Sequence, residues 1–574
     1  MKMVKEYSSE KWDLETDVVV VGSGAAGLTA AVVAANEGLK VILLEKTDKF
    51  GGATAFSGGG IWCPNNKFLR DGYQVDVYDK EKKTWVKQRI DGEIGREMAI
   101  KYLKRLALGM SSDKLIETYV DTIWRAVDYL EQHTRLKVGH VRLMPEYYPE
   151  WSEYGAVRSG RTVEPELYDV KTMPPELAEK IRLPPLTYPV KIDEIDHWGG
   201  TQCAYEWDLE LIGKRVGERL VGMGLALVCA LLHSCYEKGV DLRTETPVRH
   251  LIVKGGRVIG IIAEHRGKEL WIHARKGVIL CAGGFDWNES MTKAFLRGPS
   301  KGPAGPPCNT GDGIRLGIEV GAQLSQMTEA WWYPTGPTWM TYEGKPVYFS
   351  LLYEKACPGT IIVNKYGKRF VNECTNYRSL GRAWHVYDPA KHEFPNYPSY
   401  LIFDQACHRR YMILTISPFD ELPEPPFYKG ETLRELAQKI NVDPDGLEET
   451  VKRFNLYAKE GKDPDFHRGE SWYDQFYGDY KWKERGLPHP NLAPIETPPF
   501  YAIEILPGYL GTAGGLLINE KAQVLDWDNK PISGLYAAGN NTATCMGMGY
   551  PGGGGTIGPA ICFGYIAAKE VAKQ

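Results

Sequence analysis

The stretch Asp17-Val-Val-Val-Val-Gly-Ser-Gly-Ala-Ala-Gly27 decides the fold of this chain. Its four consecutive valines, residues 18–21, are typical of a parallel strand that is buried on both faces. Gly22, Gly24 and Gly27 follow with the spacing G-x-G-x-x-G. In this motif the first glycine permits a tight turn, the second lets the backbone approach a pyrophosphate, and the third lets helix and strand pack closely. The stretch therefore predicts a dinucleotide-binding strand–helix unit.

The next residues complete this unit in the expected order. Residues 28–35 are small and apolar and favour a helix that ends near Gly38, and residues 41–44 are typical of the next strand. Glu45 closes that strand 18 residues after Gly27. The helix N-terminus would face the phosphates, and an acid at this position accepts a hydrogen bond from a ribose hydroxyl. Because all the parts fall in register, a glycine-rich turn without a ligand is the weaker interpretation.

A second glycine-rich segment, residues 46–60, favours FAD over NAD. It combines E-K-x-x-x-x-G-G with S-G-G, which supply backbone N–H groups and hydroxyls beside a dinucleotide. An NAD domain normally continues into a third strand, whereas a long polar loop follows here; an ordinary flexible loop is the alternative interpretation. In this part of the chain the predicted FAD contacts are Gly22, Ser23, Gly24, Ala26, Gly27, Glu45, Lys46, Gly52, Thr54, Ser57, Gly58 and Gly59.

Later segments are predicted to return to the cofactor. Residues 277–285 are typical of a buried strand that ends in two glycines, and residues 534–540 of another returning strand. Residues 548–560 form a glycine-rich loop that opens the last helix. We expect Asp312, within N-T-G-D-G, to fix a turn as well. The predicted FAD contacts in these later segments are Val248, Ala282, Gly283, Asn309, Gly311, Asp312, Gly539, Asn540, Thr556 and Ile557.

Composition excludes several classes of function. The 574 residues carry a formal net charge of −4 without a basic block, so no nucleic-acid partner is expected. Eleven cysteines form no C-x-x-C and twelve histidines no H-x-x-x-H, so neither a metal site nor a disulfide framework is expected. The N-terminus, residues 1–15, is polar, and the longest apolar run, residues 220–232, is too short to span a bilayer. Dispersed thiols suit a reducing cytoplasm.

The order of the segments predicts an α/β fold with an insertion. A Rossmann-like FAD-binding domain would comprise residues 1–329 and 512–574, because the C-terminal strand and loop must return to the flavin. An α+β catalytic, substrate-binding domain would comprise residues 330–511. We further expect mostly helix over residues 65–140, an irregular excursion over 150–200, a long helix over 211–236, a three-stranded meander over 251–274 and a hairpin over 359–373.

Several motifs, in this order, resemble those of a known family. They are the glycine motif above, Glu45-Lys-Thr-Asp-Lys-Phe-Gly-Gly52, Arg369-Phe-Val-Asn-Glu373 with Tyr377, Gly511-Thr-Ala-Gly-Gly515, Gly534-Leu-Tyr-Ala-Ala-Gly-Asn540 and Tyr550-Pro-Gly-Gly-Gly554. The chain resembles the fumarate reductase and succinate dehydrogenase flavoprotein superfamily, and within it the 3-ketosteroid Δ1-dehydrogenases, over nearly its whole length. The resemblance implies an FAD enzyme that introduces a carbon 1–carbon 2 double bond into 3-ketosteroids. Since no histidine lies near Ser57, we expect the FAD to be non-covalent.

The same resemblance implies the site residues. Tyr377 corresponds to the base that removes the carbon 2 proton, while Tyr550 and the backbone amide of Gly554 correspond to the donors on the ketone oxygen. Tyr147 corresponds to a tyrosine that assists the base, although the neighbouring Tyr148 is an alternative. Phenol is a poor base at its ordinary pKa near 10, which is why the base needs a partner. The chain departs from the family at Gly553, where proline is frequent, and in its long 150–200 excursion.

Other functions stay open at this point. A related ketone desaturase is one, either a 3-ketosteroid Δ4-dehydrogenase or an enzyme of the 4-oxocyclohexanecarboxylate type. A fumarate-reductase-like flavoprotein is another, but such an enzyme needs cationic clamps, and only Arg378 and Arg382 lie near Tyr377 in the sequence. For a dehydrogenase, an external electron acceptor, a quinone or another, is expected. Residues 181–192 mix apolar and basic side chains and predict weak association with a membrane surface, so that the cytoplasmic enzyme could be peripheral at the inner membrane face.

Overall fold

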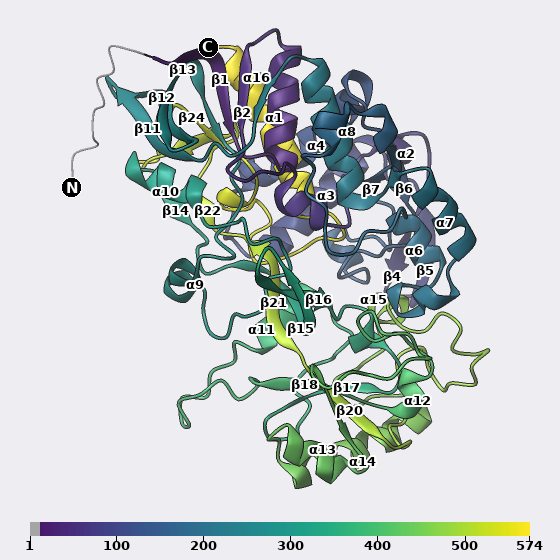
Figure 1. The fold of residues 1–574 in the computed structure, drawn as a ribbon. Coiled ribbons are helices and arrows are strands. Elements are labelled where there is room, and N and C mark those ends of the chain that lie inside the picture. The colour runs from purple at the N-terminus through teal and green to yellow at the C-terminus, as the bar shows by residue number, and fades with distance from the viewer. Residues whose placement is uncertain (1–11) are drawn as a thin grey trace.

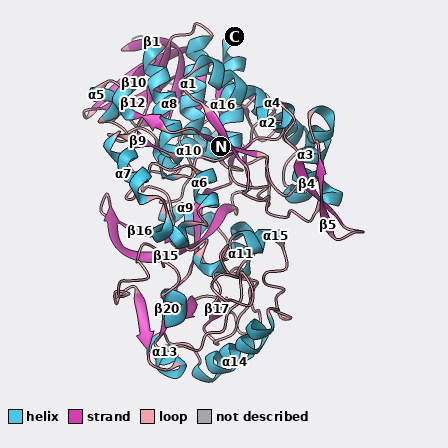
Figure 2. Ribbon diagram, turned by 90° about the vertical axis from the view of Figure 1, so that its right-hand side faces the viewer, coloured by secondary structure: helices cyan, strands magenta, loops and turns pink. Residues whose placement is uncertain are grey.

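A computed structural model describes residues 12–574 as an upper and a lower part joined by a small sheet (Figure 1). The first strand and the C-terminal helix both lie in the upper part (Figures 1 and 2). The expectation for the N-terminal residues falls mostly on residues 1–11, which lie outside the described residues. No helix in residues 12–574 is long and apolar enough to cross a membrane.

The upper part is built on an eight-stranded sheet in the order β10-β2-β1-β13-β12-β24-β23, with β11 paired to β12. β1 pairs in parallel with both β2 and β13, and its valines Val18, Val19 and Val20 are fully buried, which confirms the predicted strand. The strands are β1 (Leu14–Val21), β2 (Val41–Leu44), β10 (Asp241–Arg243), β11 (Val248–Lys254), β12 (Arg257–His265), β13 (Lys268–Leu280), β23 (Gln523–Leu525) and β24 (Pro531–Ala537).

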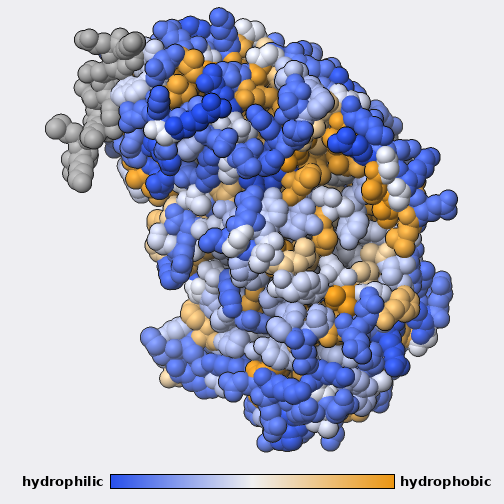
Figure 3. Space-filling model, in the orientation of Figure 1, coloured by the Kyte–Doolittle hydropathy of each residue, from blue (hydrophilic) through white to orange (hydrophobic). Residues whose placement is uncertain are grey.

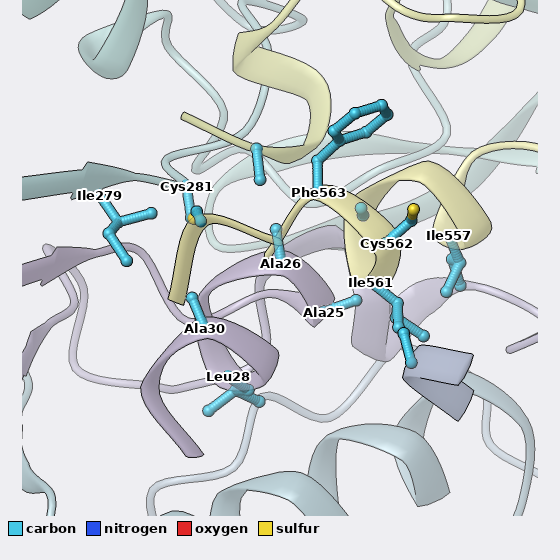
Figure 4. Packing of buried hydrophobic residues seen from close by; sticks show 14 of the residues in the cluster. Ala25, Ala26, Leu28, Ala30, Ile279, Cys281, Ile557, Ile561, Cys562 and Phe563 are labelled. Carbon is cyan, nitrogen blue, oxygen red and sulfur yellow. The ribbon is translucent and has the colours of Figure 1, made fainter. Parts of the chain in front are cut away.

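Helices α1 (Ala25–Asn36), α8 (Met223–Glu237) and α16 (Ile557–Ala572) pack beside this sheet (Figure 1). Alanine and glycine let α1 and α16 approach closely: a Cβ on Gly564 would lie 2.6 Å from the Ala26 carbonyl oxygen. Figure 4 shows Ala25 and Ala26 of α1 beside Ile561 and Cys562 of α16. This contact draws the C-terminal helix, and the loop before it, to the same end of β1 as the glycine motif.

The lower part contains a four-stranded antiparallel sheet in the order β17-β18-β20-β19. A three-stranded sheet, β16-β15-β21, joins it to the upper part, and α11 packs on β15 (Figure 1). The elements are β15 (Ala330–Tyr342), β16 (Lys345–Ser350), β17 (Thr360–Asn364), α11 (Tyr377–Ala383), β18 (Ser399–Asp404), β19 (Phe427–Gly430), α13 (Leu433–Lys439), α14 (Pro444–Glu460), α15 (Trp472–Phe476), β20 (Phe500–Glu504) and β21 (Leu506–Thr512). The division into two domains stays a prediction. Its main support is that β24, from the C-terminal segment, belongs to the same sheet as β1.

Four local predictions were wrong in part. The region 65–140 contains α3 (Gly92–Ala107) and α4 (Asp113–His133), but also the hairpin β4 (Val75–Asp79) and β5 (Thr84–Gln88). The strands expected near 270–274 and 277–285 form one strand, β13. Its first half pairs with β12, and most of its length from residue 272 onward pairs with β1. Residues 359–373 are not a hairpin, since β17 pairs with β18 instead. The expected long helix is broken between α7 (Leu209–Gly217) and α8.

Residues 150–200 contain only short helices and strands. β7 (Thr162–Pro165) lies between β3 (Ile61–Trp62) and β6 (Val138–Val141), and α6 (Ile192–His197) follows near its end. These pieces form a wall beside the glycine-rich loops, because Thr162 donates from Oγ1 to the Gly553 carbonyl oxygen at 2.9 Å.

Candidate active site

One cavity of about 860 Å³ runs from the N-terminal glycine motif to a group of tyrosines. Its lining comes from both ends of the chain and from the middle, including Ser23, Thr54, Tyr147, Tyr377 and Tyr550. The segments that the sequence placed at the cofactor and those that it placed at the reaction therefore share one continuous space.

The glycine motif has the geometry that a pyrophosphate requires. Gly22 has φ +105°, and a Cβ there would lie 2.3 Å from the Cys281 carbonyl oxygen, so no larger residue fits. A Cβ on Gly24 would meet only Thr54 Oγ1 at 3.3 Å, which leaves its backbone open to the cavity. The first turn of α1 begins at Ala25, whose N–H donates to Thr54 Oγ1 at 2.9 Å, and the N-terminus of this helix faces the cavity. The residues present thus fit a dinucleotide.

A polar network surrounds the acid that was predicted to hold a ribose. Glu45 is almost fully buried and lines the cavity. Its carboxylate accepts from Ser23 Oγ at 2.6 Å and from the Thr47 backbone N–H at 3.0 Å. Ser23 Oγ in turn accepts from the Gly51 N–H at 3.0 Å, so the first and second glycine segments are held together. The network fixes Glu45 at the end of β2.

Two of the predicted FAD contacts lie outside the cavity lining. Gly27 is buried behind the motif, where a Cβ would lie 1.9 Å from the Gly22 carbonyl oxygen, so it serves packing. Gly311 has φ +79° and precedes α10 (Asp312–Glu319), a turn position. Lys46 and Asp312 both line the cavity and form an ion pair at 2.6 Å. The other predicted contacts that line it are Gly22, Ser23, Gly24, Ala26, Glu45, Gly52, Thr54, Ser57, Gly58, Gly59, Val248, Ala282, Gly283, Asn309, Gly539, Asn540, Thr556 and Ile557.

Three of the predicted tyrosines meet at the other end of the cavity. Tyr147, Tyr377 and Tyr550 are each at most 5% exposed. The ring centroids of Tyr147 and Tyr550 lie 5.1 Å apart in a stacked pair. The ring of Tyr377 stands edge-on to both, at 5.0 Å from Tyr147 and 5.3 Å from Tyr550. Residues more than 170 positions apart in the sequence thus form one compact group.

Local backbone contacts fix these rings. Tyr377 is the first residue of α11, and the side chain of Asn376 caps that helix by accepting from the Ser379 N–H. Tyr147 lies on a short antiparallel bridge to the loop of Tyr550, since its N–H donates to the Pro551 carbonyl oxygen at 3.1 Å. This backbone hydrogen bond therefore holds Tyr147 and Tyr550 in their stacked arrangement. Tyr148 points elsewhere: its hydroxyl pairs with Ser379 Oγ at 2.5 Å, and the residue is absent from the cavity lining.

Gly554 presents a backbone donor to the same space. It has φ +92°, and a Cβ would lie 2.4 Å from the backbone nitrogens of Ile61 and Trp62, so only glycine fits. In residues 12–574 its own N–H donates no hydrogen bond. The Tyr550 hydroxyl lies 3.0 Å from Thr556 Oγ1 at the start of α16. A hydroxyl, a free amide and the positive end of a helix therefore converge where an oxygen with developing negative charge could be held.

Comparison with known proteins agrees with this geometry. The model of the FAD binding domain family matches residues 17–557. The chain belongs to this family. FAD is therefore its cofactor.

Relatives of the flavoprotein share most of its length. It is 38% identical to the 3-oxosteroid 1-dehydrogenase of Mycolicibacterium smegmatis, with 97% of each chain covered. It is 36% identical to the 4-oxocyclohexanecarboxylate 2-dehydrogenase of Sinomonas cyclohexanicum, covering 97% of this chain and 93% of that one. A crystal structure of the 3-ketosteroid Δ1-dehydrogenase from Sterolibacterium denitrificans with 1,4-androstadiene-3,17-dione is similar, with a TM-score of 0.84, 33% identity and coverage of 97% and 99%.

Burial shapes the acidity of the three phenols in the flavoprotein. It raises the pKa of Tyr377 and of Tyr147 well above 10. The neighbouring phenols add to this effect at Tyr147, whereas at Tyr377 the proximity of Tyr550 raises the pKa further and a hydrogen bond with Tyr147 lowers it. Burial also raises the pKa of Tyr550, but hydrogen bonds with Thr556 and Tyr377 and the charge of Arg378 counteract it. Tyr550 is thus held as a protonated donor at neutral pH. Tyr377 is likewise protonated at neutral pH, so its use as a base would require assistance in losing the proton.

Sequence reasoning missed an outer ring of aromatic residues. Tyr333, Tyr353 and Tyr477 also line the cavity, and Tyr333 lies 4.8 Å from Tyr377 between ring centroids. Tyr473 packs between Tyr147 and Tyr477, at 5.2 and 4.8 Å. The spacing of Tyr473 and Tyr477, four residues apart, was the signal available, because it places two rings on one helical face.

Proposed function

We propose that the flavoprotein is a 3-oxosteroid 1-dehydrogenase, an enzyme that introduces a carbon 1–carbon 2 double bond into 3-ketosteroids. The observation that carries the proposal is the convergence of Tyr377, Tyr550 and the free Gly554 amide in the cavity that also contains the FAD loops. Relatives at 38% and 33% identity that bear this activity in their names support it.

The residues divide the reaction between them. The Tyr550 hydroxyl and the Gly554 N–H hold the ketone oxygen and stabilise its negative charge as the enolate develops, each donor contributing roughly 3–4 kcal/mol by analogy with oxyanion holes. Tyr377 removes the proton from carbon 2, and Tyr147 assists it from 5.0 Å between ring centroids. Bound FAD supplies the acceptor for the hydride from carbon 1. The buried walls exclude water from this end of the cavity.

We infer that the FAD is bound without a covalent link. Among residues 12–574 no histidine lines the cavity, and the glycine loops supply the contacts. Acid precipitation should release the yellow chromophore into the supernatant, whereas a flavin that stays with the pellet would refute the inference. An external acceptor, a quinone or another, must then reoxidise the flavin.

The lining favours a neutral steroid over a small keto acid. In the described part of the chain the only lysine and arginine on the cavity are Lys46 and Arg249, and both pair with acids, Asp312 and Glu264. The tyrosine end offers aromatic and aliphatic side chains and no cation for a carboxylate. The second candidate is a dehydrogenase of 4-oxocyclohexanecarboxylate, which the relative at 36% identity supports.

One experiment separates these candidates. The FAD-loaded protein is incubated with an artificial electron acceptor and either 4-androstene-3,17-dione or 4-oxocyclohexanecarboxylate, and the new double bond is located by NMR. We expect 1,4-androstadiene-3,17-dione and at most slow turnover of the acid. Exclusive turnover of the acid would establish the second candidate. In a third incubation, with the saturated 5α-androstane-3,17-dione, a new double bond between carbons 4 and 5 would indicate a Δ4-dehydrogenase.

We further propose a cytoplasmic enzyme that rests on the inner membrane face at the cavity mouth. Leu183, Leu186 and Tyr188 are 59%, 37% and 47% exposed, and Leu186 also lines the cavity. Helix α7 lies beside this segment, since its Arg215 donates to the Pro189 carbonyl oxygen. Leu209 and Val216 of α7 are 60% and 59% exposed. Figure 3, in the same orientation as Figure 1, shows apolar residues on the side of the molecule where α7 lies. Such side chains could admit a lipid-dissolved steroid, and the free cysteines suit a reducing compartment.

Flotation with anionic liposomes at low salt tests this surface. We expect the wild type to float, and the double variant Leu183→Ser/Tyr188→Ser to stay at the bottom. Phe419→Ser, which removes an 82% exposed ring elsewhere, is the control and should float like the wild type. A wild type that does not float refutes membrane association.

A further inference from the structure

Arg378 is the residue directly after the proposed base, Tyr377. It lies in the first turn of α11 and is 1% exposed. Its side chain does not line the cavity. A fully buried guanidinium is costly unless its neighbours compensate for the lost water.

The guanidinium spans the two segments that carry the reacting groups. Nη2 donates to the Gly547 carbonyl oxygen at 2.6 Å, three residues before Tyr550. Arg378 itself follows Tyr377 in the chain. One side chain therefore ties the helix that carries the base to the loop that carries the ketone donor.

The same group is linked to Tyr550 through Trp331. Its Cζ lies 4.4 Å from the ring centroid of Trp331, and that indole stands edge-on to Tyr550 at 5.2 Å. Trp331 is fixed in turn by a hydrogen bond from Nε1 to Asn540 Oδ1 at 3.1 Å. The indole of Trp331 thus contacts the guanidinium of Arg378 and the phenol ring of Tyr550.

The charge on Arg378 is only partly compensated. Glu329 is 3.6 Å away and makes its shorter contact, 2.6 Å, with Arg382. Nε and Nη1 of Arg378 have no hydrogen-bond partner in residues 12–574. Burial lowers the pKa of Arg378 to about 10, so the group stays charged at neutral pH. A cation retained under such conditions calls for an explanation beyond packing.

We propose that Arg378 is a positioning residue that fixes the spacing of Tyr377 and Tyr550 and places a positive charge behind the Tyr550 hydroxyl. The charge strengthens the hydrogen bond that Tyr550 donates to the substrate ketone, because the phenol must share its proton with an oxygen that becomes negative. The inference rests on the proposed function, and it adds the residue through which the two halves of that site are coupled.

Three variants test the role of Arg378. Arg378→Met keeps a similar side-chain volume but removes the charge and the N–H donors of the guanidinium. Arg378→Lys keeps the charge, and Arg382→Met is the matched control. Arg382 lies one turn further along α11, shares Glu329, is about 30% exposed and makes only a long hydrogen bond, 3.4 Å, to the same loop at the Met548 carbonyl oxygen. With 4-androstene-3,17-dione we expect kcat to fall roughly 30–100-fold in Arg378→Met with KM changed less than about threefold, a partial recovery in Arg378→Lys, and a change within about threefold in Arg382→Met.

A second readout reports on the ketone itself. The oxidised, FAD-loaded enzyme binds 1,4-androstadiene-3,17-dione labelled with oxygen-18 at carbon 3, and difference infrared spectroscopy gives the stretch of that carbonyl. We expect the band to move toward its solution position in Arg378→Met and to keep its wild-type position in Arg382→Met. A merely structural arginine would not shift it selectively.

The outcomes separate this inference from the proposed function. A wild type that binds and converts no 3-ketosteroid overturns the proposed function. A wild type that does so, with an Arg378→Met variant of unchanged kcat and carbonyl band, overturns the inference alone, as does an equal loss in Arg382→Met. If Arg378→Met does not fold, Arg378→Lys decides: a reduced kcat and a displaced band at full FAD content support the inference, and wild-type values overturn it.

Discussion

The two ends of the cavity are built in different ways. At the nucleotide end the backbone makes the site: Gly22, Gly24 and the start of α1 lie within a few residues of one another. At the tyrosine end side chains make it, and Tyr147, Tyr377 and Tyr550 come from three distant segments. The first end needs particular backbone conformations, whereas the second needs particular hydroxyls. Substitutions at the first should therefore cost fold and cofactor together, and substitutions at the second should cost chemistry alone.

The largest expected effect is at the nucleotide end. Gly22→Ala forces a Cβ to within 2.3 Å of the Cys281 carbonyl oxygen at φ +105°, and should destabilise the protein by on the order of 3–5 kcal/mol with loss of bound FAD. Gly38→Ala is the matched control, since Gly38 has φ +81° but nothing within 4 Å. It should cost about 1–2 kcal/mol and keep the flavin. Thermal unfolding and flavin absorbance measure both, and equal effects would contradict the comparison.

The next effect is at the tyrosine end and should leave the fold intact. Tyr377→Phe removes the base and should lower kcat by about 1000-fold or more, while FAD content stays at the wild-type level and the steroid still perturbs the flavin spectrum. Loss of FAD in this variant would break the comparison.

The wild-type pH profile sharpens the same point. Burial raises the pKa of Tyr377 above 10, so its deprotonated fraction increases with pH over the neutral and mildly alkaline range. The logarithm of kcat/KM should accordingly rise by up to about one per pH unit, and Tyr377→Phe should abolish that rise. A profile that falls over this range would contradict the assignment of the base.

Tyr550→Phe should have a smaller effect, because the Gly554 N–H remains as a second donor. We expect kcat to fall about 100-fold to 1000-fold and the steroid to bind somewhat more weakly, since the ground-state ketone accepts the same hydrogen bond. Steady-state kinetics and flavin difference spectra measure both quantities. A loss confined to binding would show that Tyr550 holds the substrate without stabilising the enolate.

Much of the nucleotide end was predictable from sequence, and the reason is locality. G-x-G-x-x-G, the buried valines and Glu45 are consecutive features of one strand–helix–strand unit, so spacing alone orders them. The tyrosine end was accessible only through family resemblance, because no local pattern announces that Tyr147 and Tyr550 will stack. Which of Tyr147 and Tyr148 faces the cavity depends on a backbone bridge between residues 146 and 552. No sequence pattern marks Tyr353 or Arg378 as part of the site, because their surroundings arise only from tertiary packing.

The smallest expected effect distinguishes those two neighbours. Tyr147→Phe should slow turnover by about 10-fold, because water can partly replace an assisting hydroxyl. Tyr148→Phe is the adjacent control and should leave kcat within about twofold, since its hydroxyl pairs with Ser379 outside the cavity lining. Initial rates with 4-androstene-3,17-dione measure both, and a larger loss in Tyr148→Phe would exchange their roles.

The most direct test of the account is the exchange of the steroid carbon 2 proton with deuterated solvent, followed by mass spectrometry under conditions that prevent net oxidation. If Tyr377 is the base, the wild type exchanges this proton whether or not the flavin is oxidised, and Tyr377→Phe does not. Normal exchange in a Tyr377→Phe variant that no longer dehydrogenates the steroid would show that another residue removes the proton.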